Sequence, residues 1–519
     1  MTMQYTVADV VRVRAAEDPQ RLAVSSEDKA LDWTELYRNA RRVADGLQRS
    51  GIRPQERVSF IDRNCIEYFE FIFGCALLNV IPVPINWRLS AAEILETLRD
   101  AGSRLLIVGE EFHPTIASIE ADLPAVEMIA IGDHGRWRGY LDWCGTGDPA
   151  DPMVHPKPDD VAIHFYSSGT TGRPKGILWS AANAEFLLRD TSRYYGIVRD
   201  DVSLLTMPLF HSGGTGWSLC GMINGCKSVT VRQFEARSVL DTIAREGVTV
   251  SMFVPAMLAA ICAVPGARDK TASVRQINYT GSPITEKNLL DSMAVFDAAF
   301  IQNYGLAETT GGFAQLDPED HDPNGPRAAL LRSVGKAYPG IELKVVDPET
   351  GEEQAPGAFG ELWTRSGQNM LGYYNMPEAT ARTITADGWL KTGDGGYIDA
   401  EGYIFLTDRL KDVIISGGEN VYPTEVENVL ASHPAVAEVA VIGVPSERWG
   451  ETVKAIVALK PGQQATAEEL IGYSATLLAG YKRPTSVDFL PALPRNPTGK
   501  LLKAVLREPY WQAMQRRIA

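Results

Sequence analysis

Short apolar runs alternate with longer amphipathic stretches over roughly residues 20–260, and this alternation limits the folds open to the chain more than any other property of its sequence. The runs at residues 104–108 (RLLIV) and 248–254 (VTVSMFV) have the length of buried strands, whereas residues 33–48 form a longer helical pattern. Strands that alternate with helices usually pair in parallel and are covered by the helices. The sequence therefore predicts an α/β fold for most of the chain.

A chain of 519 residues is too long for one hydrophobic core, because cores stop growing at about 250–300 residues. From about residue 334 to 408, strand-like segments such as GELWTR alternate with Gly, Asp and Pro turns, and they predict a small antiparallel part. Farther on, a strand-like VIISG, a helix that opens at Pro423 and a capping pair, Thr466 and Glu469, predict a small α+β domain. We place the N-terminal domain at residues 1–408, a hinge at 409–411 and the C-terminal domain at 412–519.

The composition excludes some classes of protein. A net charge of −15 without a long Lys/Arg run argues against a nucleic-acid partner. The six cysteines form no CxxC pair and the seven histidines no HxH or HExxH spacing, so we expect reduced, mostly buried thiols and no zinc site. An anionic ligand would have to be held by locally placed cations and backbone N–H groups.

The sequence gives no sign of export or of a membrane span. Its first twenty residues lack the basic start, apolar middle and cleavage site of a signal peptide. The most apolar stretch, residues 69–85, is interrupted by Glu70, Asn79, Pro82 and Pro84, and it predicts a buried helix that leads into a strand. We therefore expect a cytoplasmic protein without a transmembrane segment. Its oligomeric state stays open, a homodimer included.

The strongest chemical signal is the segment YSSGTTGRPKG at residues 166–176, directly after the strand-like VAIHF. Its glycines let a ligand approach the backbone, its hydroxyls and N–H groups can donate to phosphate oxygens, and Lys175 adds a positive charge. A P-loop would end in Gly-Lys-Ser/Thr and open a helix, but Gly176 and the strand-like ILW follow here. A mobile surface loop is the plain alternative. The residues of this segment that we expect to contact phosphate are Ser167, Ser168, Gly169, Thr170, Thr171, Gly172 and Lys175.

This segment resembles the phosphate loop of the adenylate-forming superfamily, which includes acyl-CoA synthetases, luciferases and nonribosomal peptide adenylation domains. NYGLAETT at residues 303–310 resembles the second signature of that superfamily. The resemblance implies that Tyr304 packs on adenine and that Glu308 holds Mg²⁺, an ion that prefers a few carboxylate and phosphate oxygens. It also implies nucleotide contacts from Asn303, Gly305 and Thr309, and from Gly281, Ser282 and Pro283 of a TGSP segment.

Ala307 departs from the pattern, because many members carry a threonine directly before the glutamate, where its hydroxyl can reach the α-phosphate. Either Thr309 or Thr310 replaces that hydroxyl, or one hydrogen bond is missing. The loss of one neutral hydrogen bond, about 1 kcal/mol, would slow the reaction without abolishing it.

Three later segments, KTGD, DRLKD and ISGGEN, resemble further signatures in the order of the superfamily. The resemblance implies that Asp394 and Arg409 bind the ribose, that Lys411 lies at the hinge, and that Gly417 and Gly418 let a pantetheine arm pass. PRNPTGKLLK at residues 494–503 resembles the closing signature, which makes Lys500 the catalytic lysine of adenylation. A preorganised cation stabilises the charge that develops on the α-phosphate, so its removal should slow adenylation by about 10²–10³. His211 in PLFHSGG matches a position that borders the acyl site, although a purely structural histidine is an equal alternative.

The resemblance implies an α/β enzyme with a mobile C-terminal lid domain that ligates a carboxylic acid to coenzyme A, with ATP and Mg²⁺. The acid first becomes an acyl-adenylate with release of pyrophosphate, and its acyl group then passes to the thiol with release of AMP. We expect an apolar acid of medium length or longer, such as a fatty acid. Alternatives are an aryl-acid CoA ligase, an enzyme that loads a carrier protein, a luciferase-like oxygenase, and a nucleotide-binding module without catalysis.

Overall fold

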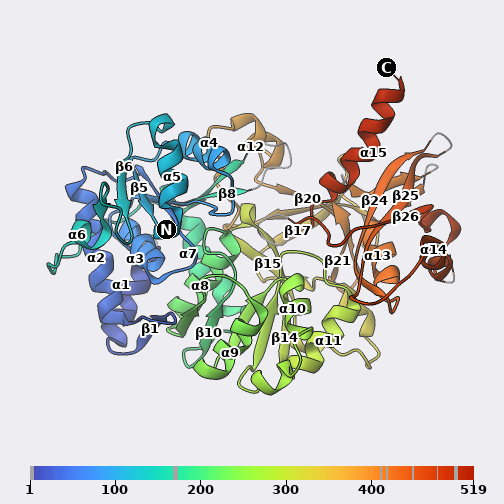
Figure 1. Ribbon diagram of the computed structural model, residues 1–519, viewed down its shortest axis with the longest axis horizontal. Helices are drawn as coiled ribbons and strands as arrows, with labels where there is room; N and C mark the ends of the chain where they lie inside the picture. The colour runs from blue at the N-terminus through green and yellow to red at the C-terminus, as the bar shows by residue number, and fades with distance from the viewer. Residues whose placement is uncertain are drawn as a thin grey trace.

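The computed structural model describes residues 5–167, 174–409, 412–416, 419–446, 449–475, 477–495 and 501–518. Figure 1 shows a large body that contains the elements up to β21, and a smaller C-terminal part beside it. The α/β architecture with a large N-terminal and a small C-terminal domain confirms the predicted fold class. The domain boundaries themselves stay a prediction, since residues 410–411 lie outside the described ranges.

The main sheet has nine strands in the order β16-β15-β14-β13-β12-β10-β11-β1-β2. The neighbours from β14 to β1 pair in parallel, and the antiparallel pairs lie at the two edges. The central strand β12 is buried along its whole length, as expected of a strand covered on both faces. The bounds are β16 Lys336–Ala337, β15 Gly311–Leu316, β14 Ala299–Leu306, β13 Gln276–Tyr279, β12 Val250–Phe253, β10 Val202–Leu205, β11 Lys227–Thr230, β1 Leu22–Ser25 and β2 Ala30–Asp32.

Helices connect the parallel strands of this sheet, because a parallel pair needs a long crossover. In Figure 1, α8, α9, α10 and α11 lie beside the green and yellow strands β10 and β14. Helix α8 begins with a glycine-rich turn, and α9 has a buried stripe formed by Val239, Leu240 and Ile243. The bounds are α1 Val7–Glu17, α7 Ala181–Arg189, α8 Ser212–Ile223, α9 Ala236–Glu246, α10 Pro255–Cys262 and α11 Glu286–Phe296.

A second, all-parallel sheet has the order β4-β3-β5-β6-β7. The predicted helix at residues 33–48 is α2, and the side chain of Asp32 caps it by accepting a hydrogen bond from Glu35 N–H. The apolar stretch at residues 69–85 forms the buried helix α3 followed by β4, as predicted. The bounds are β3 Arg57–Ile61, β4 Ile81–Pro84, β5 Leu105–Val108, β6 Glu127–Ala130, β7 Arg138–Gly139, α2 Trp33–Arg49, α3 Ile66–Leu77, α4 Ala91–Ala101, α5 His113–Ile119 and α6 Tyr140–Cys144.

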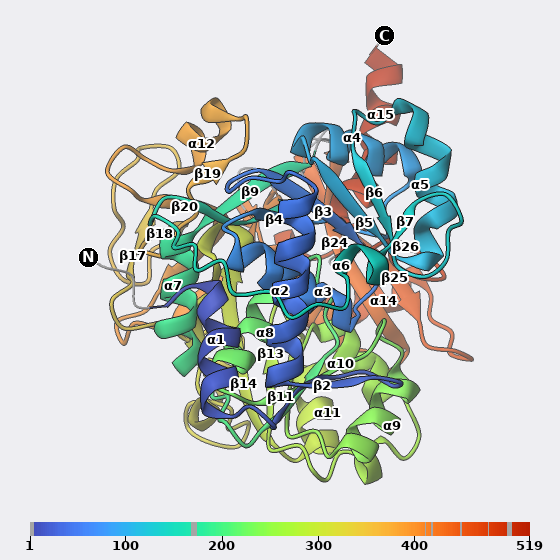
Figure 2. The same cartoon turned by 90° about the vertical axis from the view of Figure 1, so that its left-hand side faces the viewer.

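Two smaller sheets carry Ser167, Lys175, Asp394 and Arg409 of the predicted site. The ribbon β19-β9-β8 joins β8 (Val161–Ser167), β9 (Lys175–Ser180) and β19 (Gly372–Tyr373), which lies next to α12 (Pro377–Thr383). Figure 2 shows β9 and β19 near the top of the large body. The predicted antiparallel part is the sheet β17-β18-β20-β21, formed by β17 Glu342–Val346, β18 Gly360–Arg365, β20 Leu390–Ile398 and β21 Ile404–Arg409.

The C-terminal part is a sheet in the order β23-β22-β25-β24, with β26 paired to β25. Its own core includes Ile414, Val426 and Val441. The predicted cap at Thr466 is present, because its hydroxyl accepts from the N–H of Glu469 at 3.2 Å. The bounds are β22 Ile414–Ser416, β23 Glu419–Val421, α13 Pro423–Ala431, β24 Val436–Ser446, β25 Gly450–Leu459, α14 Ala467–Ala475, β26 Ser486–Phe489 and α15 Lys503–Ile518.

All six cysteines are free thiols, five of them buried, as predicted. Within the described ranges no helix has both the length and the hydropathy that a membrane crossing requires.

Candidate active site

The two strands that flank the predicted phosphate loop pair antiparallel up to its base. Ser167 is the cross-strand partner of Lys175, and Tyr166 is the partner of Gly176. This confirms that the segment leads into a strand and not into a P-loop helix. The side chain of Lys175 is half-buried at the start of β9. Ser168, Gly169, Thr170, Thr171 and Gly172 lie outside the described residues, so their phosphate contacts stay a prediction.

Gly176 packs against the ring of His164. A Cβ atom at position 176 would lie 2.1 Å from His164 Nε2, so only glycine fits there. His164 is fully buried, and its Nδ1 accepts a hydrogen bond from Arg57 Nε at 3.3 Å. Burial, with the Arg57 guanidinium beside it, lowers the pKa of His164 to about 3. A neutral histidine therefore supports the strand that carries Lys175.

Lys175 and Glu308 both contact Tyr373, one at its ring and the other at its hydroxyl. The ammonium of Lys175 lies 4.7 Å from the ring centroid of Tyr373, and the Tyr373 hydroxyl donates to Glu308 Oε1 at 2.9 Å. The backbone of Glu308 is held as well, because its carbonyl accepts from Met370 N–H at 2.8 Å. The structure thus joins two predicted site residues that are distant in sequence. No local sequence pattern indicates Tyr373, since only the pairing of β19 with β9 brings it there.

Tyr304 and Asp394 form a second pair. The Tyr304 hydroxyl donates to Asp394 Oδ2 at 2.8 Å, and both residues are buried. The Tyr304 ring also packs edge-on against Phe313, with centroids 4.7 Å apart. Asp394 of β20 is the cross-strand partner of Arg409 of β21. The residues predicted to bind adenine and ribose therefore come together, although their contacts with a nucleotide are untested.

The turn around Glu308 is tightly built. A Cβ at Gly305 would lie 2.1 Å from the Gly311 carbonyl oxygen, and Thr310 has a φ of 48°. The turn is anchored by Trp179, whose indole N–H donates to the Ala307 carbonyl at 2.7 Å. This geometry fixes where the Glu308 carboxylate lies relative to β9.

The two threonines that could compensate for Ala307 differ. Thr309 is fully buried and its hydroxyl accepts from Leu306 N–H at 2.9 Å, with the Gly311 carbonyl 2.8 Å away, so its own turn uses that hydroxyl and not a ligand. The Thr310 hydroxyl is buried and has no hydrogen-bond partner among the described residues. Of the two threonine hydroxyls, the one of Thr310 is therefore not used by hydrogen bonds within the turn.

The predicted adenine and acyl segment TGSP follows β13, the parallel neighbour of β14. The Thr280 hydroxyl donates to the Asn303 carbonyl at 2.7 Å, and Gly281 has a φ of 90°, which favours glycine. Ser282 is half-buried and Pro283 exposed. The Asn303 side chain is buried and bonded to Asn278 at 2.8 Å. In this structure it stabilises the strand ends.

His211 caps helix α8. Its Nδ1 accepts a hydrogen bond from Gly213 N–H at 3.1 Å, which is the structural role that the sequence left open. Asn64 holds the preceding loop at two points, since its side chain binds the Met207 carbonyl at 3.1 Å and the Leu209 N–H at 2.9 Å. The loop that presents His211 is therefore rigidly placed, whether or not His211 also borders an acyl group.

The remaining predicted residues belong to the C-terminal signatures. Lys411, Gly417, Gly418 and Lys500 lie outside the described residues, and of Arg409 only the backbone is described. The flanks of the Lys500 segment are placed, because Arg495 and Leu501 form an antiparallel bridge. The approach of Lys500 to the nucleotide stays a prediction.

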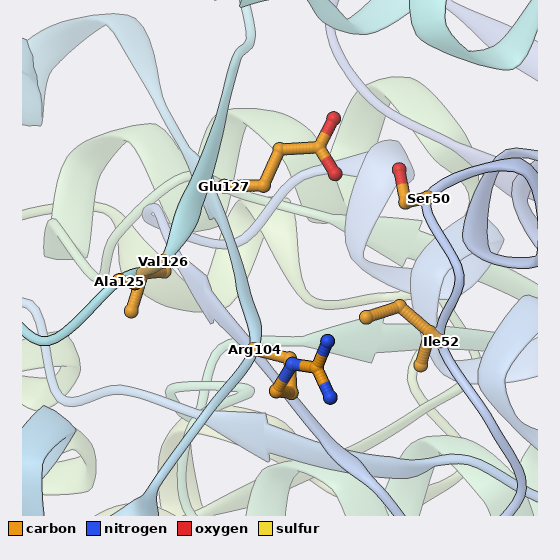
Figure 3. Close-up of a pocket in the computed structure, with 6 residues that line it drawn as sticks. All are labelled: Ser50, Ile52, Arg104, Ala125, Val126 and Glu127. Carbon is orange, nitrogen blue, oxygen red and sulfur yellow. The ribbon is translucent and has the colours of Figure 1, made fainter.

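An open surface hollow lies elsewhere. It has a volume of about 360 Å³ and is lined by Ser50, Ile52, Arg104, Ala125, Val126 and Glu127, which Figure 3 shows around an open space. Arg104 directly precedes β5 and Glu127 begins β6, so the hollow lies at the amino ends of parallel strands. Ligands of such sheets bind at the carboxyl ends. None of the predicted site residues lines it, and we assign it no role in the reaction.

The residues around Glu308 fit a magnesium ion better than a metal held by protein ligands alone. The described residues contain no group of three or more His, Cys, Asp or Glu side chains that could hold a metal. Mg²⁺ is usually bound by one or two carboxylates together with substrate phosphates and water. A single carboxylate that shares a tyrosine contact with a lysine predicted to bind phosphate would therefore be an adequate protein contribution.

Comparison with known proteins identifies the family. The model of the AMP-binding enzyme family matches residues 11–374, and the model of the AMP-binding enzyme C-terminal domain matches residues 425–500. The chain therefore belongs to the AMP-binding enzyme family, the adenylate-forming superfamily that its motifs resemble. It is an AMP-forming acid–thiol ligase of the acyl-CoA synthetase class, which uses ATP, Mg²⁺ and coenzyme A.

Individual relatives cover nearly the whole chain. The fatty acid–[acyl-carrier-protein] ligase ScoC of Streptomyces coeruleorubidus is 39% identical over 99% of this chain and 98% of its own length. A feruloyl-CoA synthase of an Amycolatopsis species is 35% identical, over 96% and 97%. The crystal structure of ATP-bound MatB from Rhodopseudomonas palustris is similar with a TM-score of 0.87 and 29% identity, and it covers 98% of this chain and 99% of that one.

Proposed function

We propose that the chain activates a fatty acid of medium length or longer and transfers the acyl group to coenzyme A. The observation that carries the proposal is the cluster in which Tyr373 contacts both Lys175 and Glu308. The cluster would place a cation and a carboxylate-bound metal together at the phosphates of ATP. The Tyr304–Asp394 pair supplies an aromatic ring and a carboxylate suited to the adenosine.

In the first step, a carboxylate oxygen of the acid would attack the α-phosphorus of ATP. A new P–O bond forms, the bond to the bridging oxygen breaks, and pyrophosphate leaves with the electron pair. Lys175 and the N–H groups of its loop would hold the departing phosphates. Lys500 would approach from the C-terminal domain and stabilise the charge on the α-phosphate. Mg²⁺ bound at Glu308 would supply further neutralisation of phosphate charge.

In the second step, the thiolate of coenzyme A would attack the acyl carbonyl carbon, and AMP would leave with the electron pair of the broken C–O bond. Gly417 and Gly418 would line the path of the pantetheine arm. Because Lys500 serves the first step and these glycines the second, the C-terminal domain would rotate about residues 409–411 between them. A cytoplasmic location is part of this proposal.

Two relatives of the chain favour different classes of acid. The relative named as a fatty acid ligase favours an alkyl chain, but the feruloyl-CoA synthase, which covers the chain almost as fully, favours an aryl acid. A second candidate function rests on the same relative: ScoC is named for a carrier protein as the acyl acceptor, so this chain could load a phosphopantetheine carried by a protein.

The test is acid-dependent exchange of pyrophosphate into ATP, measured with octanoate, dodecanoate, hexadecanoate, ferulate and benzoate. AMP formation is then measured with the best acid and either coenzyme A or a phosphopantetheinylated carrier protein. Exchange that is fastest with dodecanoate or hexadecanoate, and AMP formation that depends on coenzyme A, would support the proposal. Preference for ferulate would establish the aryl alternative, and dependence on the carrier would establish the second candidate. Absence of exchange with every acid would refute the assignment.

A further inference from the structure

We propose that Tyr373 is a positioning residue that couples metal binding at Glu308 to phosphate binding at Lys175. The inference rests on the proposed function, because it takes from it the roles of those two residues. Tyr373 itself belongs to none of the signature segments of the superfamily named above.

The hydroxyl of Tyr373 orients the Glu308 carboxylate. It donates to Oε1 at 2.9 Å, and no described residue donates a hydrogen bond to the second oxygen, Oε2. A hydrogen bond to one oxygen restricts the rotation of the carboxylate and so limits where the other oxygen can lie. Hydrogen bonds of this kind to metal ligands are known to matter, since their removal costs about 10–100-fold in metal affinity or activity.

The ring of Tyr373 limits where the Lys175 ammonium can lie. The 4.7 Å separation from the ring centroid is within the range of a cation–π contact. Lys175 is the last residue of the loop and the first of β9, so its side chain would otherwise rotate about four bonds. A ring face beside it keeps the positive charge next to the tyrosine whose hydroxyl contacts Glu308.

The backbone fixes Tyr373 itself from three directions. Tyr373 is the antiparallel partner of Ile177, and its N–H donates to the Thr380 hydroxyl at 2.9 Å. The neighbouring Tyr374 N–H donates to the Gly176 carbonyl at 2.7 Å. Only 8% of the Tyr373 surface is exposed. Such a constrained side chain can transmit position, which a mobile surface tyrosine could not.

The two contacts can be separated by substitution. Tyr373→Phe keeps the ring and removes the hydroxyl, so it should weaken metal binding alone. Tyr373→Leu removes both, so it should weaken metal binding and also ATP binding without metal. Tyr374→Phe is the matched control. Tyr374 contacts Gly176 of β9 through its backbone N–H, and the centre of its ring lies 3.9 Å from the guanidinium carbon of Arg57.

The experiment uses the full-length protein without any acid, so that no turnover occurs. Binding of Mn²⁺ in the presence of ATP is measured by electron paramagnetic resonance, and ATP binding in the presence of EDTA by calorimetry. We expect Tyr373→Phe to raise the Mn²⁺ dissociation constant about 10-fold or more, with metal-free ATP affinity unchanged. In exchange assays, excess Mg²⁺ should restore the rate of this variant. Tyr374→Phe should match the unmodified protein in all three measurements.

A double-mutant cycle shows whether Tyr373 acts through Glu308. In a Glu308→Gln background, Tyr373→Phe should have no further effect on Mn²⁺ binding, because the carboxylate that it orients is gone. An Mn²⁺ affinity of Tyr373→Phe equal to that of the unmodified protein, or an effect that persists with Glu308→Gln, would overturn the inference. Failure of the proposed function would give a different result. The protein would still bind Mn²⁺ and ATP in a manner that depends on Tyr373, but none of the acids would support pyrophosphate exchange.

Discussion

Replacement of Gly176 by alanine tests whether the phosphate loop depends on the close approach of its strand to His164. The added Cβ would lie 2.1 Å from His164 Nε2, whereas an unstrained contact needs about 3.5 Å. The overlap is therefore about 1.4 Å, and His164 has little room to relieve it. Its ring is fully buried, stacks on Tyr166 with centroids 4.6 Å apart and is bonded to Arg57.

Overpacking of a buried site costs about 1–3 kcal/mol. If the strand stays in place, this cost lowers the free energy of unfolding, and 1 kcal/mol shifts Tm by about 2–4 °C in domains of 150–250 residues. If β9 moves instead, Lys175 moves with it, and the same cost appears as weaker ATP binding, about 5- to 150-fold. We expect Gly176→Ala to lower the Tm, to weaken ATP binding, or to do both to a smaller extent.

The assay combines calorimetric unfolding with the KM for ATP in the exchange reaction. Gly147→Ala is the control, because a Cβ at that position meets no atom within 4 Å. In a second variant, His164→Ala is added to Gly176→Ala, which removes the clash and should recover part of the loss. If Gly176→Ala kept both the Tm and the ATP KM of the unmodified protein, the contact with His164 could not be what places β9 and Lys175.

Three further substitutions address other parts of the structure. Asn64→Ala leaves the Met207 carbonyl and the Leu209 N–H without their partner, so the free energy of unfolding should fall by about 1–3 kcal/mol. The KM for the acid should rise more than the KM for ATP. Equal changes in both KM values would contradict a local effect on the loop that carries His211. Burial lowers the pKa of His164 from 6.5 to about 3, so between these pH values the unfolded chain binds a proton at this residue that the folded chain does not. The free energy of unfolding therefore falls by about 1.4 kcal/mol per pH unit as the pH drops from 6.5 towards 3. Urea unfolding from pH 7.5 to 5 should therefore show a shallower acid loss in His164→Gln, and identical slopes would disprove this explanation. Lys411→Pro should spare pyrophosphate exchange but reduce thioester formation, whereas equal loss of both activities would argue against a hinge at this position.

Local patterns in the sequence were enough for the main elements. The helix at residues 33–48, the interrupted apolar stretch at 69–85 and the cap at Thr466 depend on neighbouring residues, and the structure confirms each of them. The loop that opens a strand was also readable, because Gly176 and the following apolar residues exclude a helix start. Periodicity and capping chemistry act over a few residues, which is why a sequence displays them.

The contacts that assemble the site are of another kind. The pairing of β19 with β9 and the hydrogen bond between Tyr304 and Asp394 join segments that no local pattern relates. For the same reason the sequence could not show that His211 caps α8 or that Thr309 is committed to its own turn. The motifs identified the chemistry through resemblance, but the tyrosine between Lys175 and Glu308 required the three-dimensional structure.

The register of β20 against β21 has a consequence for how the two half-reactions are linked. Asp394 faces Arg409 across this hairpin, and the chain passes from Arg409 directly to the C-terminal part. On the proposed mechanism, the residue that binds the sugar of the nucleotide and the start of the moving domain therefore lie on adjacent strands of one hairpin in the four-stranded sheet. Substitutions that stiffen or loosen this hairpin at positions other than Asp394 and Arg409 would then change the rate at which the enzyme alternates between its two half-reactions.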